Sequence, residues 1–436
     1  MSKELVVKLF TTDYLTLIAP VLLMSALVEY FVFRKSKIHS FNESIANTYL
    51  GIMNQIVFLI CRTTQYFIYF LIYKNWAILD LYSLSAIGFA ITTIFALFFW
   101  DFLHYWAHRV GHVTKIGWAF HSPHHQSNEF NLTIAFRNGM MQQIFEFSFY
   151  IPLAILGIPP EVYICISGFS LFIQFISHAH WFPNLGPLEK LFNVPRHHIV
   201  HHASNPCYLD KNFSGGFIIW DKLFGTYKEL DPNVPPIFGT TIPYHGYGPL
   251  ESNLHEFKIL LGLQNTKPER AFHSLFSDRV FSKAHILTHF SVLLFLVVKS
   301  GLVLGGAQKI DFSLRIILSI FTVFCMSLLG KALSGKGSRL LEFLRLLSTS
   351  VVFLFLIQKN TQPAAGLISV VFAYYLIFHL VQVYSYLSAS IVSIWAALRA
   401  GQTPNNTPVT NEIENAGSRI QSGARILNRG TSQLTK

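Results

Sequence analysis

The chain has 436 residues, of which 52% are hydrophobic, 15% aromatic and only 13% charged. This composition is too apolar for a soluble protein of that length and predicts a helical membrane protein. The net charge of +11 is not gathered on a basic soluble module, so no nucleic-acid partner is expected. We interpret it as a topology signal and as an attraction to anionic lipid surfaces.

Several apolar stretches are long enough to cross a hydrocarbon core of about 30 Å. The fourth is interrupted by Gly157-Ile158-Pro159-Pro160, which predicts a helical hairpin whose ends face the same side. The predicted fold class is therefore all-α, a polytopic helical membrane protein. The stretches lie near residues 14–33, 51–73, 83–103, 141–179, 285–306, 313–330, 340–357 and 364–396.

Basic residues indicate which ends of these stretches face the cytosol. Arg34, Lys35 and Lys37 follow the first stretch, whereas Lys3 and Lys8 precede it. Since cytosolic loops carry an excess of Lys and Arg, the end of the first stretch is predicted to be cytosolic. Further basic residues accompany the histidine clusters described next, so these clusters are predicted to share that side.

Twelve of the nineteen histidines fall between residues 104 and 202. They form three clusters, in which histidines three or four residues apart share one face of a helix. The clusters are HRVGH at 108–112, HSPHH at 121–125 and HHIVHH at 197–202. The clusters predict a histidine-rich metal site. The candidate ligands are His108, His112, His121, His124, His125, His178, His198, His201 and His202.

Nine imidazoles suffice for two metal ions, because one zinc or iron seldom takes more than four protein ligands. Imidazole suits Fe, Zn, Cu and Ni, so the spacing does not choose the metal. Asp101 lies seven residues before His108 on the same helical face, where its carboxylate could hold an imidazole N–H. His104 and His197 adjoin better-spaced neighbours and are candidates for the outer shell of the site.

Three predicted regions follow along the chain. Residues 1–282 are expected to form the core of the membrane protein, with a cytosolic cap after residue 180. Residues 283–399 are expected to form a second block of membrane helices, and the polar tail at 400–436 is expected to be disordered.

The order of the motifs resembles the fatty acid hydroxylase and sterol desaturase superfamily of membrane di-iron oxygenases. The resemblance covers roughly residues 85–230 and includes the three clusters, the lone His178 and the closing stretch WDKLFGT at 220–226. Within the superfamily the chain is most similar to the alkylglycerol monooxygenase branch. The grounds are Asn131-Leu132-Thr133, the stretch NLGPLE at 184–189 and the helical block after residue 285.

This resemblance implies two iron ions, dioxygen as co-substrate and hydroxylation of a lipid carbon. For the alkylglycerol branch it implies attack on the ether-linked carbon, which yields a hemiacetal that breaks into glycerol and a fatty aldehyde, with tetrahydrobiopterin as reductant. The chain lacks a Gly-rich dinucleotide fingerprint, so electrons are expected from a separate molecule. Glu129 is a candidate for pterin binding and Asn131 for the outer shell of the metal site. No catalytic side chain is predicted beyond the metal ligands.

Two alternatives stay open. The same chemistry could act on a sterol, fatty acyl chain or carotenoid, with an electron-donor protein of the cytochrome b5 type. A histidine-rich metal transporter is a distant alternative, because transporters bind ions near the bilayer midplane, whereas these ligands lie at helix ends. The expected location is the endoplasmic reticulum membrane of a eukaryote or the inner membrane of a bacterium.

Overall fold

The computed structural model describes residues 2–11, 14–33, 36, 38–244, 246–263 and 312–334. These residues belong to one compact unit that comprises Met1–Arg345. Within them the regular structure is helical apart from two isolated β-bridges. The all-α prediction is therefore confirmed for the described residues. The predicted spans at 285–306, 340–357 and 364–396 and the tail at 400–436 lie outside these ranges.

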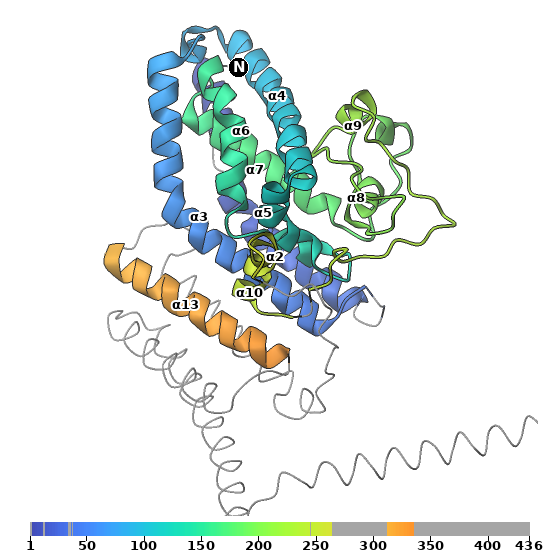
Figure 1. Cartoon of the computed structure of the whole chain (residues 1–436). Coiled ribbons are helices and arrows are strands. Elements are labelled where there is room, and N and C mark those ends of the chain that lie inside the picture. The colour runs from blue at the N-terminus through green and yellow to red at the C-terminus, as the bar shows by residue number, and fades with distance from the viewer. Residues whose placement is uncertain are drawn as a thin grey trace, which may run out of the picture. The chain divides into compact units, whose positions relative to one another are not determined.

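The α-helices are numbered as in Figure 1. They are α1 (Lys3–Thr11), α2 (Tyr14–Phe33), α3 (Phe41–Trp76), α4 (Ala86–Val113), α5 (Lys115–His125), α6 (Gln142–Leu156), α7 (Pro160–Ser177), α8 (Pro195–His202), α9 (Ile219–Leu223), α10 (Pro249–Leu260) and α13 (Phe312–Leu333). Three short 3-10 helices are η1 (Leu81–Ser83), η2 (Leu132–Phe136) and η3 (Gly186–Lys190).

A bundle formed by α3, α4, α6 and α7 is the centre of the fold (Figure 1). Helix α6 contacts both α3 and α4, and α7 contacts α4 and the two N-terminal helices. The bundle core is rich in aromatic side chains: Trp100 of α4 stacks on Tyr150 of α6 with 4.7 Å between ring centroids, and Tyr69 stacks on Tyr163 at 4.6 Å. Such ring pairs stabilise a packed interface beyond the area they bury.

Helix α6 ends at Gly157, as the Gly-Ile-Pro-Pro sequence predicts. Gly157 has a left-handed φ of 100°, and a Cβ there would lie 2.0 Å from the carbonyl oxygen of Leu79. Only glycine combines this dihedral with so close an approach. Pro160 then opens α7 at its first turn, where the missing N–H costs nothing.

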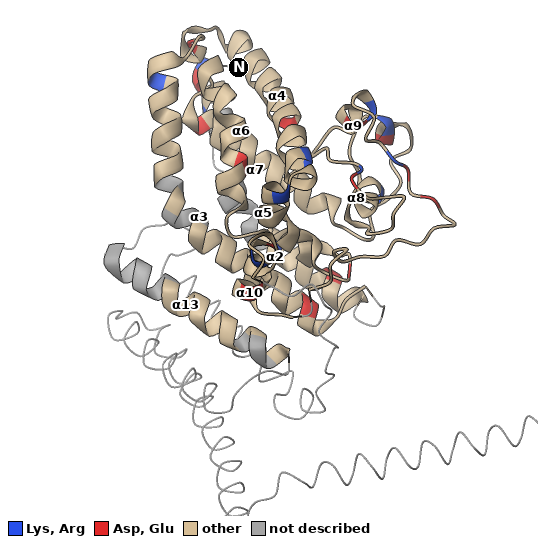
Figure 2. Ribbon diagram, in the orientation of Figure 1, with Lys and Arg blue, Asp and Glu red and all other residues tan. Residues whose placement is uncertain are grey.

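The polarity of the bundle differs from that of the segment that follows α7. Of the described helices, α4 and α7 are long and apolar enough to cross a membrane. Ile87, Ile91 and Phe95 project from α4 with 74%, 62% and 56% of their surface exposed. Figure 2 shows few charged residues along α4, α6 and α7 and many in the region of α8 and α9.

Candidate metal centre

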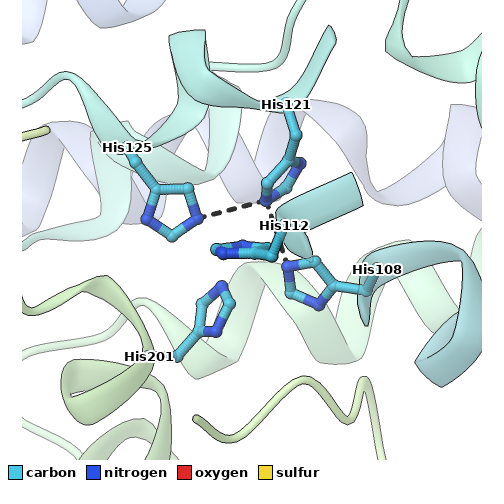
Figure 3. Close-up of side chains that lie close together, drawn as sticks. All are labelled: His108, His112, His121, His125 and His201. Carbon is cyan, nitrogen blue, oxygen red and sulfur yellow. Dashed lines mark hydrogen bonds between the residues drawn. The ribbon is translucent and has the colours of Figure 1, made fainter. Parts of the chain in front are cut away.

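Five predicted ligands converge in one group, which we call the five-histidine group: His108, His112, His121, His125 and His201. One ring nitrogen from each lies within 4.8 Å of the others. Figure 3 shows the five imidazoles pointing toward a common centre from α4, α5 and α8. The Nε2 atom of His121 is 3.1 Å from Nε2 of both His108 and His125.

The other four predicted ligands form a second cluster, the four-histidine group: His124, His178, His198 and His202. All four residues are buried. The Nε2 atom of His178 lies 3.3 Å from that of His124, 3.2 Å from that of His202 and 3.1 Å from that of His198. The structure thus brings all nine sequence-predicted ligands together, in two adjacent groups.

The helical repeat explains how two groups arise from three sequence clusters. On α5, His121 and His125 are four residues apart and join the five-histidine group, whereas the intervening His124 joins the other. On α8, His198 and His202 join the four-histidine group, and the intervening His201 joins the first. Residues four apart lie above one another on a helix, so each of these helices contributes to both groups.

The tautomers of four imidazoles follow from their backbone partners, since a carbonyl oxygen can only accept a hydrogen bond. The Nδ1 atoms of His108, His124, His178 and His201 donate to the carbonyl oxygens of Phe213 (2.7 Å), Arg137 (3.0 Å), Gln174 (2.7 Å) and Lys211 (3.0 Å). The Nε2 atoms of these rings therefore carry lone pairs rather than protons.

Lone pairs that face one another at contact distance call for a cation between them. The Nε2 atoms of His124 and His178 are both acceptors, so their separation of 3.3 Å is not a hydrogen bond. Within the described residues, the buried Nε2 atoms of His112 and His201 have no hydrogen-bond partner. Buried polar atoms are normally satisfied, and neutral imidazole is a common ligand of Fe and Zn. Both groups therefore fit a metal ion.

Burial keeps the imidazoles in the neutral form that binds metal. It lowers the pKa of His121, His124 and His125 well below the usual value, and neighbouring histidines lower these pKa values further. Loss of solvation on burial also lowers the pKa of His178, to about 4. Protonation, which would compete with a metal, is disfavoured in such surroundings.

The N–H of His108 donates to the carbonyl oxygen of Phe213 and not to Asp101, so the role predicted for Asp101 from their spacing is wrong. Its carboxylate instead accepts hydrogen bonds from the backbone N–H of Gly216 (2.6 Å) and Phe217 (3.0 Å) and from Nε1 of Trp220 (2.9 Å). The helical spacing does place Asp101 on the same side of α4 as His108, but the loop of residues 213–217 lies against that side and takes the hydrogen bonds of the carboxylate. Asp101 therefore supports the site by holding the loop that provides the carbonyl partner of His108.

The WDKLFGT stretch completes this support. Asp221 accepts hydrogen bonds from the backbone N–H of Phe213 (2.8 Å) and Ser214 (2.9 Å) and from Oγ1 of Thr226 (2.7 Å). Gly215 lies between these anchors, and a Cβ there would approach a ring carbon of His104 to 2.8 Å. The motif is thus a scaffold for the loop, a role that spacing along the chain does not reveal.

The two remaining histidine candidates lie outside both groups. Nδ1 of His104 pairs with the hydroxyl of Tyr150 at 3.1 Å, and its ring stacks on Trp100. Nδ1 of His197 lies 3.4 Å from the backbone N–H of Val194. The structure thus places His104 beside the five-histidine group and His197 at the start of α8.

Asn131 and Glu129 have local partners. The Asn131 side chain caps η2 by accepting from the backbone N–H of Thr133 at 3.0 Å, and it donates to the carbonyl oxygen of Ile38 at 2.6 Å. Glu129 accepts from the backbone N–H of Ser40 at 2.9 Å. Both side chains connect the segment after α5 to the start of α3.

A small cavity of about 50 Å³ touches both histidine groups. Its lining includes His108 and His121 of the first group and His178 of the second, with Gln142 and Glu146 of α6 also on its wall. This is room for a few molecules the size of water or dioxygen. Glu146 is not among the site residues predicted from the sequence, because the path of the loop between the second cluster and α6 cannot be read from spacing.

Comparison with known proteins shows what the segment that carries this site is similar to. Residues 93–226 match the model of the fatty acid hydroxylase family. This segment contains all nine histidines of the two groups. Residues 93–226 are therefore similar to the fatty acid hydroxylase domain, and the resemblance inferred from the motifs is confirmed.

Among curated proteins, alkylglycerol monooxygenases are similar to the chain. The one from Homo sapiens is 36% identical over 214 residues, which are 49% of this chain and 46% of that protein. The one from Danio rerio is 39% identical over 202 residues, 46% of this chain and 44% of that protein. An ornithine lipid hydroxylase from Rhizobium tropici is 30% identical over 141 residues, 32% of this chain and 43% of that protein.

The matched segment thus spans about half the length of the curated relatives. No solved structure matches the chain significantly.

Proposed function

We propose that the chain is a dioxygen-dependent lipid monooxygenase with two iron ions, which hydroxylates the ether-linked carbon of alkylglycerol lipids. The observation that carries the proposal is the convergence of nine imidazoles, eight of them from buried residues, in two adjacent groups whose facing nitrogens carry lone pairs. Similarity to alkylglycerol monooxygenases supports the choice of substrate.

In this proposal the five-histidine and four-histidine groups each hold one iron ion. Iron would supply the redox chemistry that activates dioxygen when bound. The protein holds the imidazoles neutral by burial and fixes their rings through carbonyl partners such as Phe213 and Gln174. The small cavity against both groups gives room for dioxygen beside them.

The overall reaction balances with an external reductant. One oxygen atom replaces a hydrogen on the ether carbon as a hydroxyl group, and the other leaves as water with two electrons and two protons from the reductant. The resulting hemiacetal breaks its carbon–oxygen bond to give glycerol and a fatty aldehyde. Tetrahydrobiopterin is the proposed reductant, as the family resemblance implies.

We further propose that the chain is a multi-pass protein whose metal centre faces the cytosol, in the endoplasmic reticulum of a eukaryote or the inner membrane of a bacterium. The apolar character of α4 and α7 supports membrane insertion. The concentration of charged residues around α8 and α9 (Figure 2) supports a location of this segment outside the bilayer core.

The substrate assignment is tested with the purified full chain in lipid nanodiscs, loaded with ferrous iron and supplied with dioxygen. A 1-O-alkylglycerol should yield fatty aldehyde only when tetrahydropterin is present. The 1-O-acyl analogue should be spared, because its corresponding carbon is a carbonyl without a hydrogen to replace. Release of aldehyde without iron, or equal use of the acyl analogue, would contradict the proposal.

A second candidate keeps the chemistry but changes the substrate to a fatty acyl chain, sterol or carotenoid with a cytochrome b5-type donor. The similarity to an ornithine lipid hydroxylase, a relative named for a different lipid, favours a substrate other than an ether lipid. The same preparation with an NADPH-driven reductase and cytochrome b5 should then produce a hydroxylated or desaturated lipid and leave the ether lipid intact with pterin.

A further inference from the structure

The two histidine groups differ in the partners that surround them. Nδ1 of His112 in the five-histidine group lies 3.7 Å from the carboxylate of Asp210. A second ring of that group, His121, is hydrogen-bonded by the side chain of Gln142. Gln142 in turn donates from Nε2 to the carboxylate of Glu146 at 2.8 Å. Two acidic side chains therefore adjoin the five-histidine group, one directly and one through an amide.

A buried cation lies near the four-histidine group. Its rings donate to the backbone carbonyl oxygens of Arg137 and Gln174. The guanidinium of Arg137 is itself buried and donates to Pro123 O (2.6 Å) and Asn47 Oδ1 (2.9 Å). Rings of both groups donate to carbonyl oxygens, so the difference between the groups is the buried cation near one and the Asp210 carboxylate beside the other.

Glu146 determines which end of the Gln142 amide faces His121. An amide has a donor NH₂ at one end and an acceptor oxygen at the other. Gln142 and Glu146 are four residues apart on α6, so their side chains lie on the same helical face. Because the NH₂ group is held by the carboxylate, the oxygen is left to accept from the His121 ring. Without the carboxylate, a flipped amide would present a donor to a donor.

We propose that Glu146 is a positioning residue for the five-histidine group, and that Glu146 and Asp210 together make this group the tighter of two cation sites. Negative charge near an imidazole raises its basicity and stabilises a bound cation. The inference rests on the proposed function only in requiring that both groups bind a metal.

Equilibrium binding of Co²⁺ to the metal-free full chain tests the proposal, with visible absorption as the readout. The wild-type protein should show a tight and a weaker binding event. Glu146→Leu removes both the charge and the hydrogen-bond acceptor. It should lower the Co²⁺ affinity of the tight binding event by about 10–100-fold and leave the affinity of the weaker event unchanged. Glu146→Gln, which keeps an acceptor for Gln142 but loses the charge, should weaken the tight event by a smaller factor.

Asp210→Asn is an independent arm if the leucine variant does not fold. Asp210 has a left-handed φ of 55°, which asparagine adopts readily, so the backbone is preserved while the charge is lost. This variant should also weaken only the tight event. The matched control is Glu161→Gln, because Glu161 pairs with Tyr82 on an exposed surface; neither event should change.

The outcomes separate the inference from the proposed function. If the wild type binds two Co²⁺ ions but the Glu146 and Asp210 variants leave both events unchanged, or weaken both equally, the positioning role is wrong and the metal proposal stands. If the wild type binds no Co²⁺, both proposals fail.

Discussion

Replacing Asp101 by Asn should loosen the loop that supports the metal centre. The Asp101 carboxylate accepts three hydrogen bonds, from Gly216 and Phe217 N–H and from Trp220 Nε1. An asparagine oxygen placed at Oδ2 can keep the bonds from Phe217 and Trp220. Its NH₂ group would then face the N–H of Gly216 at the position where the carboxylate oxygen now lies 2.6 Å away.

The magnitude follows from these contacts. Losing one hydrogen bond to a charged group costs about 1.5–3 kcal/mol, and leaving a buried N–H unsatisfied costs about 1–3 kcal/mol. Because these costs overlap, we expect the free energy of unfolding to fall by about 2–4 kcal/mol. The unit comprises Met1–Arg345, and at about 2.1 cal/mol/K of unfolding entropy per residue this loss corresponds to roughly 3–6 °C in melting temperature.

Two measurements check the prediction: the melting temperature of the purified protein, and hydrogen exchange of the backbone amides at 213–217. Exchange should accelerate there, because the carboxylate anchors that loop. Asp80→Asn is the matched control, since Asp80 is an exposed cap of η1 and asparagine caps equally well. Unchanged exchange in the loop together with a melting temperature equal to that of the control would refute the reasoning.

Two further predictions concern the centre and its orientation. His198→Ala should remove one of two bound metal equivalents and abolish turnover. The control His180→Ala changes an exposed histidine two residues from His178 and should retain both equivalents. Metal analysis of the purified variants tests this prediction, and two full equivalents in His198→Ala would contradict the assignment. Accessibility tags at residue 115, at the start of α5, and at residue 210, shortly after α8, should both report the cytosolic side, because α5 and α8 contribute to the same histidine groups. Labelling from opposite sides would rule out a shared site.

The linear sequence determined which histidines make up the two groups and much of the helical pattern. Spacings of three and four residues place imidazoles on one helical face whatever the rest of the chain does. The turn between α6 and α7 was equally predictable, because Gly157 and the following prolines restrict the backbone locally.

The tertiary structure alone decided how the ligands are shared and what surrounds them. Spacing could not show that His124 and His201 belong to different groups from the other histidines on their own helices. That division depends on how α5 and α8 face each other. Nor could it show that Asp101 holds a backbone loop or that Glu146 reaches His121 through Gln142. These contacts join residues distant in the chain, and their partners are set by packing between elements rather than by local periodicity.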